Sequence, residues 1–191
     1  MMSFPPSSLG GRISKFGILL LIILGLGGLM AEAAPAQTPL ASQVKAAFLY
    51  NFAKFVEWPP GTFPDDQAAI TLGFLDGEPL AGALETLQGK AVHGRRLEVK
   101  RCRSIEEVKK CQIFFASAAN KARLPQILDA LKNSPVLTVT DEVDNFAKLG
   151  GIINFIIVDD KIGFEICLNN SRQSGLTISS QLLKLAKLVN H

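Results

Sequence analysis

The sequence predicts an α/β fold: a three-layer sandwich in which helices cover both faces of a mostly parallel sheet of about six strands, with a C-terminal antiparallel hairpin. Short apolar runs alternate with segments of helical periodicity between residues 70 and 148, which indicates strands joined by crossover helices. Two further apolar runs, over residues 152–158 and 161–168, are separated only by Asp159-Asp160, a spacing typical of a tight hairpin.

The first expected helix covers residues 40–57. Val44, Phe48 and Phe52 recur at four-residue steps and give it one apolar face. We expect Ser42 to cap its start, and Trp58-Pro59-Pro60-Gly61 to end it, because proline lacks a backbone donor.

The remaining elements follow in alternation. Ser104 and Glu107 form an S-x-x-E capping box, which marks the start of one short helix. The strand over residues 136–140 is apolar on both sides, as a central strand should be. The expected strands are 70–75, 97–102, 112–116, 136–140, 152–158 and 161–168, and the expected helices are 79–87, 104–110, 120–132, 142–148 and 178–189.

Residues 1–36 have the pattern of a secretory signal peptide. Arg12 and Lys15 precede an uncharged apolar stretch over residues 16–30, and the small residues that follow allow cleavage after Ala33 or Ala36. The alternative is an uncleaved N-terminal anchor. Cleavage would leave residues 37–191 as a single α/β domain in an oxidising compartment, the periplasm of a Gram-negative cell.

The three cysteines matter in such a compartment. We expect a disulfide between Cys102 and Cys111, because they end one predicted strand and begin the next. Closing so short a loop would stabilise the fold by roughly 2–3 kcal/mol. The alternative is that these two and Cys167 are reduced, buried thiols.

The sequence contains no arrangement that predicts catalysis. No nucleophile elbow, phosphate-binding loop or dinucleotide-binding motif is present, and neither His93 nor His191 has metal-ligand spacing. We therefore expect a non-enzymatic protein without cofactor or metal. The polar residues at strand ends, Asp76, Ser117, Thr140 and Asp141, indicate either loop caps or a crevice for a small molecule.

Two surface features suggest binding instead. Residues 90–110 hold eight Lys or Arg against three Glu, which indicates either attraction to an anionic partner or a solvated face. This segment lacks interleaved aromatics, so nucleic acid is not an expected partner. The first helix and its end carry more aromatics than one face can bury, which favours a protein interface or core packing: Phe48, Tyr50, Phe52, Phe55 and Trp58.

Residues 44–59, VKAAFLYNFAKFVEWP, resemble the opening signature of the YfiR-like family of periplasmic proteins. Three later segments resemble that family in the same order: CQIFF over residues 111–115, LTVTD over 137–141 with GGIINF over 150–155, and GLTISSQLLKLA over 175–186. Together they cover essentially the whole predicted mature chain.

The resemblance implies a periplasmic, non-enzymatic regulator that binds and represses the periplasmic sensor domain of an inner-membrane signalling protein. By analogy with the namesake, that protein is a diguanylate cyclase, so that repression controls cyclic di-GMP and biofilm formation; a sensor kinase is the alternative partner. The resemblance also implies a homodimer and an outer-membrane lipoprotein as a further partner. A different class of function is a periplasmic small-molecule binding module that uses the strand-end crevice and feeds a membrane receptor or histidine kinase.

Overall fold

The computed structural model describes residues 39–190 of the 191-residue chain. The predicted leader over residues 1–36 and His191 lie outside the described residues. The helical elements are α2 (Pro39–Phe55), α3 (Ala81–Glu85), α4 (Ile105–Val108), η1 (Ala118–Asn120), α5 (Leu124–Ala130), α6 (Leu168–Gln173) and α7 (Ser180–Leu183). The strands are β1 (Val56–Glu57), β2 (Ile70–Leu75), β3 (Ala91–Val92), β4 (Arg95–Cys102), β5 (Ile113–Ser117), β6 (Leu137–Asp141), β7 (Ile153–Val158), β8 (Lys161–Cys167), β9 (Thr177–Ile178) and β10 (Lys187–Val189).

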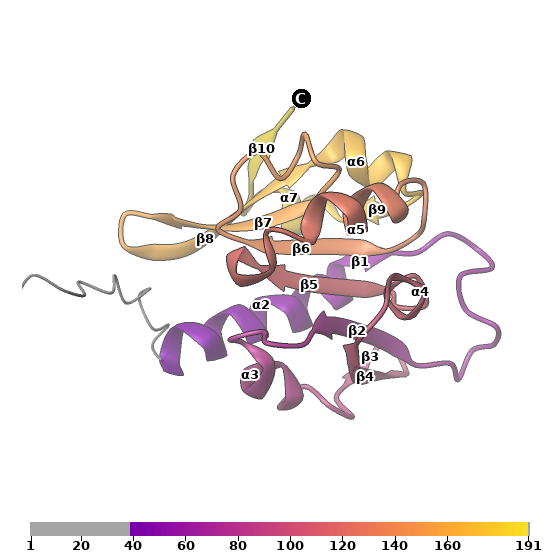
Figure 1. Ribbon diagram of the computed structural model, residues 1–191. Helices are drawn as coiled ribbons and strands as arrows, with labels where there is room; N and C mark the ends of the chain where they lie inside the picture. Colours follow the sequence, from indigo (N-terminus) through magenta and orange to yellow (C-terminus); the bar gives the residue numbers. More distant parts are fainter. Residues whose placement is uncertain (1–38, 191) are drawn as a thin grey trace, which may run out of the picture. The chain divides into compact units, whose positions relative to one another are not determined.

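The main sheet has eight strands in the order β10-β8-β7-β6-β5-β2-β4-β3 (Figure 1). Strands β4, β2, β5, β6 and β7 are mutually parallel, whereas β7 and β8 form an antiparallel hairpin. The two residues between β7 and β8, Asp159 and Asp160, both have positive φ angles (48° and 59°), as a type I′ turn requires. The predicted mostly parallel sheet and its C-terminal hairpin are therefore confirmed.

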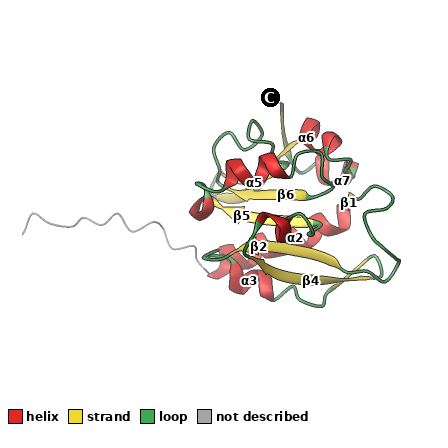
Figure 2. Ribbon diagram, turned by 45° about the vertical axis from the view of Figure 1, so that its right-hand side comes forward, coloured by secondary structure: helices red, strands yellow, loops and turns green. Residues whose placement is uncertain are grey.

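Helices lie on both faces of the sheet, which confirms the predicted three layers (Figure 2). One core joins α2, α3 and α7 to one face, and it includes Phe52, Leu84 and Leu182. The other core joins α4 and α5 to the opposite face, and it includes Val108 and Ile127. Each face of the central strands is covered, so these strands are apolar on both sides.

The C-terminal prediction was wrong. The spacing of Ile178, Leu182, Leu185 and Val189 fits one helical face, yet the helix α7 stops at Leu183 and the chain then forms β10. Strand β10 pairs in parallel with residues 165–167 of β8, so the hairpin does not form the edge of the sheet along its whole length. Hydrogen bonding to an open strand edge, which is a tertiary interaction, outweighs the local helical pattern here.

Two smaller expectations were also wrong. The segment 142–148 is a turn rather than a helix, and both Glu142 and Asn145 have positive φ angles near 54°. The buried side chain of Asn154 bonds to the backbone N–H and carbonyl of Val143, which holds this turn against β7. Ser42 is not a cap, because α2 begins at Pro39.

Candidate functional site

The aromatic residues of α2 do not form one surface patch. Phe52 is completely buried and packs against Phe155 and Phe164 of the hairpin, with ring centroids 5.7 and 5.0 Å away. Phe48 is half-buried one turn earlier, and its ring lies 5.5 Å from that of Phe164. Phe48 and Phe52 thus both pack against the hairpin. Phe52 belongs to the buried core and is not part of the molecular surface.

The other aromatics point elsewhere. The Tyr50 hydroxyl donates to the carbonyl oxygen of Ala91 at 2.8 Å, and the Lys54 ammonium lies 4.1 Å from the centre of its ring. Trp58 lies beyond the end of α2, where its indole N–H donates to the carbonyl oxygen of Gln112. Phe55 is half-buried against the same core as Phe52.

The β7–β8 hairpin carries exposed apolar side chains at its tip. Ile157 and Val158 are 51% and 49% exposed, and the hairpin extends beyond the neighbouring strands (Figure 1). Residues 161–164 of β8 have no strand on their outer side within the described chain, because β10 reaches only residues 165–167. Exposed apolar residues beside an unpaired strand edge are features of protein interfaces.

The predicted strand-end residues are tied to other protein groups instead of lining an open crevice. Asp141 is buried, and its Oδ1 accepts from the Lys45 ammonium at 2.6 Å. The Ser117 backbone N–H donates to the Glu78 carboxylate at 3.0 Å. Asp76 is exposed and lies 3.6 Å from the Arg101 guanidinium.

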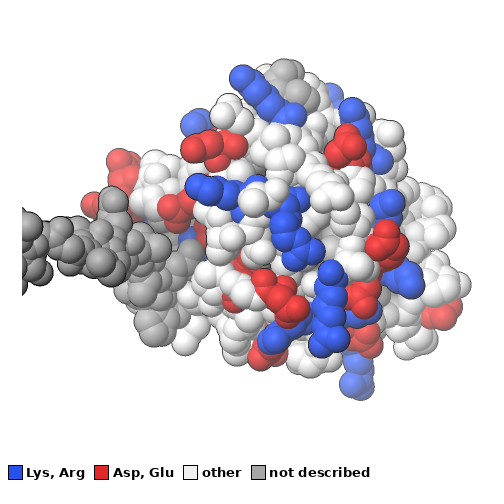
Figure 3. Space-filling view, in the orientation of Figure 1, with Lys and Arg blue, Asp and Glu red and all other residues white. Residues whose placement is uncertain are grey.

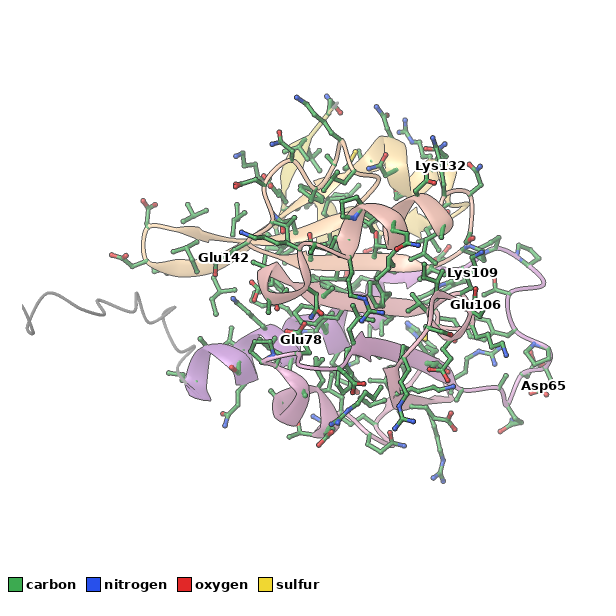
Figure 4. The ribbon with its side chains drawn as sticks, in the orientation of Figure 1. Asp65, Glu78, Glu106, Lys109, Lys132 and Glu142 are labelled. Atoms are coloured by element: carbon green, nitrogen blue, oxygen red, sulfur yellow. The ribbon has the colours of Figure 1, made fainter. Side chains whose placement is uncertain are left out.

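Glu78 is a buried carboxylate that the sequence analysis missed (Figure 4). Its Oε2 accepts from the backbone and hydroxyl of Ser117 and from the Asn120 amide, while Oε1 is buried without a partner. Burial raises the pKa of Glu78 above its ordinary value, because the charged form loses hydration. Thr140, the fourth strand-end residue, donates its hydroxyl to Asn154 Oδ1.

Lys45 was also missed, although it lies within the aromatic helix. Its side chain is 2% exposed, and its ammonium bonds to Asp141 and lies 3.3 Å from Glu142 Oε1. A lysine amid an apolar helix face, with an acid at the end of a predicted central strand, is a signal that could have found this pair. The pair links α2 to the end of β6.

Cys102 and Cys111 lie side by side as free thiols, with 3.7 Å between their sulfur atoms. Both sulfurs lie over Gly73 of β2, where an added Cβ atom would lie 2.9 Å from Cys102 Sγ and 2.5 Å from Cys111 Sγ. The hydrogen bond between the thiols lowers the pKa of Cys102 and, with burial, raises that of Cys111. Cys167 is buried as well.

The basic segment 90–110 is interspersed with acidic side chains rather than forming one patch (Figure 3). Arg101 lies 3.5 Å from Glu85, and Arg95 donates to the carbonyl oxygens of Asp65 and Ala68. His93 occupies the turn between β3 and β4, where its Nε2 lies 2.8 Å from the Lys54 carbonyl oxygen. These contacts favour a solvated face over a site for an anionic macromolecule.

Within residues 39–190, no cluster of three or more His, Cys, Asp or Glu side chains could hold a metal ion. No helix in that same stretch is both long enough and apolar enough to span a bilayer.

One solved structure has a similar fold, and a second aligns more weakly. A conserved domain protein from Vibrio cholerae O1 biovar El Tor aligns with a TM-score of 0.51 and 12% identity, over 78% of this chain and 60% of that one. The ABC domain in complex with L-Trp from Streptococcus pneumoniae aligns with a TM-score of 0.43 and 14% identity, over 62% of this chain and 56% of that one. In both cases the chain spans less than two thirds of the other protein, and the Vibrio likeness concerns the fold alone.

The sequence itself matches a family model described as YfiR/HmsC-like over residues 42–187. The match runs from the first turns of α2 to the start of β10, so it includes both the aromatic helix and the hairpin. Because it spans far more than half of the chain, the chain belongs to the YfiR/HmsC-like family, a family of non-catalytic periplasmic regulators of cyclic di-GMP signalling.

Proposed function

We propose that this chain is a periplasmic repressor that binds the extracytoplasmic sensor domain of an inner-membrane signalling protein, a diguanylate cyclase. The family match over residues 42–187 is the observation that carries the proposal. Binding in the periplasm requires export, which the predicted signal peptide over residues 1–36 would provide. A sensor kinase as the target is the alternative, and the experiment below distinguishes the two.

The contact surface that we propose is the tip of the β7–β8 hairpin together with Phe48. Ile157 and Val158 expose about half of their side-chain surface, and Phe48 packs against the base of the same hairpin through Phe164. Burying these apolar groups against a partner would contribute roughly 25 cal/mol for each Å² removed from water. Phe52 is left out of this surface because it is fully buried.

The test is affinity capture with the tagged chain from inner membranes of the native cell, followed by identification of the captured proteins. We expect a membrane diguanylate cyclase with the unaltered chain and about tenfold less of it with an Ile157→Lys/Val158→Lys variant. Leu185→Lys is the matched control, because Leu185 is 71% exposed outside the hairpin and α2. Capture of no signalling protein contradicts the proposal, capture of a kinase supports the alternative, and equal loss with Leu185→Lys contradicts the hairpin surface.

Family membership also supports two proposals about assembly. The chain would form a homodimer, which light scattering of the purified protein measures directly. An outer-membrane lipoprotein would act as a further partner that releases repression. Capture of such a lipoprotein from the outer-membrane fraction tests it.

We also propose that Cys102 and Cys111 form a disulfide in the oxidising periplasm. Their sulfurs lie 3.7 Å apart over Gly73, so a small approach joins them. Mass spectrometry after alkylation without reduction should show both residues unlabelled, whereas Cys167 provides the internal thiol reference. Alkylation of both Cys102 and Cys111 in unreduced, denatured protein would disprove the bond.

A further inference from the structure

A pocket of about 250 Å³ lies on the face of the sheet covered by α5. Its walls come from the end of α5, the start of β6, the turn over residues 147–150 and the end of α6. Lys132 stands at the end of α5 beside it (Figure 4). This is well above the ~10–15 Å³ that one water molecule needs in the same measure, so a small metabolite fits.

Asn170 supplies a fixed acceptor in this pocket. Its side chain is 4% exposed, and its Nδ2 donates to the carbonyl oxygens of Ala147 and Gly151 at 2.8 and 2.7 Å. Two carbonyl acceptors fix the orientation of the amide, since a flipped amide would place oxygen against oxygen. Oδ1 receives no hydrogen bond from the described residues, so it is available to a donor group of a ligand in the pocket that Asn170 lines.

Thr138, the second residue of strand β6, supplies a hydroxyl donor. Its side chain is buried, and its Oγ1 accepts from the backbone N–H of Ile152 at 2.9 Å. That bond uses a lone pair and leaves the hydroxyl proton without an acceptor among the described residues. An acceptor atom on a ligand in the pocket would satisfy it.

The charges around the pocket favour an anion. Lys132 and Lys148 are exposed residues of the lining, and Asp129 is the acidic residue against them. The lining therefore carries a net positive charge of one. Two exposed lysines of the lining and the buried Thr138 hydroxyl match a carboxylate, while the Asn170 oxygen matches a hydroxyl group.

We propose that this pocket binds a small organic anion that also carries a hydroxyl group, of the hydroxycarboxylate class. The pocket lies at the amino-terminal end of β6, whereas the hairpin tip follows the carboxyl end of the parallel strand β7, so the two sites are separate. The inference is therefore independent of the repressor role, and a failed capture experiment leaves it intact.

Titration calorimetry of the purified full chain with L-malate tests the proposal. Malate carries two carboxylates and one hydroxyl, and succinate is the same molecule without the hydroxyl. We expect saturable one-to-one binding of L-malate, and binding of succinate about tenfold weaker, because the Asn170 oxygen then has no donor. Equal binding of the two acids would overturn the role of the hydroxyl.

Two charge-matched variants locate the binding. A Lys132→Gln/Lys148→Gln variant should bind L-malate about tenfold more weakly. A Lys121→Gln/Lys184→Gln variant loses the same charge at exposed positions outside the lining and should bind normally. The absence of saturable L-malate binding by the unaltered chain, or an equal loss in both variants, would overturn the proposal.

Discussion

At the scale of single residues, Glu78 makes the fold sensitive to pH. Its carboxyl is buried at the ends of β2 and β5, with one oxygen bonded three times and the other unpartnered. Burial raises the pKa of Glu78 in the folded state, so the folded chain binds more protons than the unfolded chain between pH 4.5 and that raised pKa. Stability from this group is therefore present at low pH and is lost as the pH rises through the folded pKa.

Glu78→Gln should remove that pH dependence. The amide oxygen can accept the bonds from Ser117 and Asn120, and no charge needs to be buried. We expect the melting temperature of the variant, relative to that of the unaltered chain, to rise between pH 5 and pH 8. Glu98→Gln, at an exposed position, is the control. A difference that is constant with pH would show that Glu78 does not titrate in this way.

Gly73 matters because two sulfur atoms occupy the space where its side chain would be. A Cβ atom there would lie 2.5 Å from Cys111 Sγ and 2.9 Å from Cys102 Sγ. Gly73→Ala should lower the free energy of unfolding by about 1–3 kcal/mol through overpacking. Gly82→Ala in α3 adds the same methyl group into open space and should be neutral or stabilising. Urea unfolding of both variants makes the comparison, and equal stability would contradict it.

At the scale of elements, the pattern of the sequence predicted correctly those strands and helix ends that depend on residues close to one another in sequence. Strand β2 begins and ends where its apolar run does, and Ser104 caps α4 by accepting from the Glu107 N–H. The segment 142–148 escaped prediction because Asn154, a residue of β7, holds its backbone from outside. Strand β10 was not predicted because it forms by pairing with the edge of β8. Non-local partners of this kind leave no periodicity in the sequence.

The residues of the candidate site likewise fall into two groups, those that local features of the sequence identified and those that they did not. Composition and spacing identified the aromatic residues and the cysteine pair, since these are local features. Glu78 and Lys45 were missed because their partners lie 39 and 96 positions away in sequence. Aromatic content also could not separate Phe52, which is core, from Phe48, which reaches the surface, since that depends on the position of the hairpin.

A substitution in the β7–β8 turn can increase the stability of the fold. Asp159 and Asp160 both occupy the left-handed region that glycine adopts without strain. Asp160→Gly should stabilise the chain by up to about 1 kcal/mol, measured by urea unfolding. Asp144→Gly removes the same side chain from a position without a positive φ angle and should give no stabilisation. Stabilisation of both variants alike would argue against relief of turn strain.

At the scale of the whole molecule, the two cores share one sheet, and buried polar bonds fix how the layers are joined. The Lys45–Asp141 pair joins α2, which covers one face, to the end of β6 at the centre of the sheet. Apolar packing permits a helix to slide along a face, whereas a buried ion pair has one satisfactory geometry. We therefore expect this pair to set the position of α2, and with it that of Phe48 beside the hairpin.

Lys45→Met tests that role. The variant removes the Lys45 ammonium from the buried Asp141 carboxylate, which should cost about 3–5 kcal/mol of unfolding free energy. Adding Asp141→Asn removes the buried negative charge as well, so the double variant should be less destabilised than the sum of the single ones. Lys121→Met, at an exposed position, should change stability by less than about 0.5 kcal/mol. If Lys45→Met matched Lys121→Met in urea unfolding, the ion pair would not determine how α2 docks, and additive single variants would exclude coupling between the two residues.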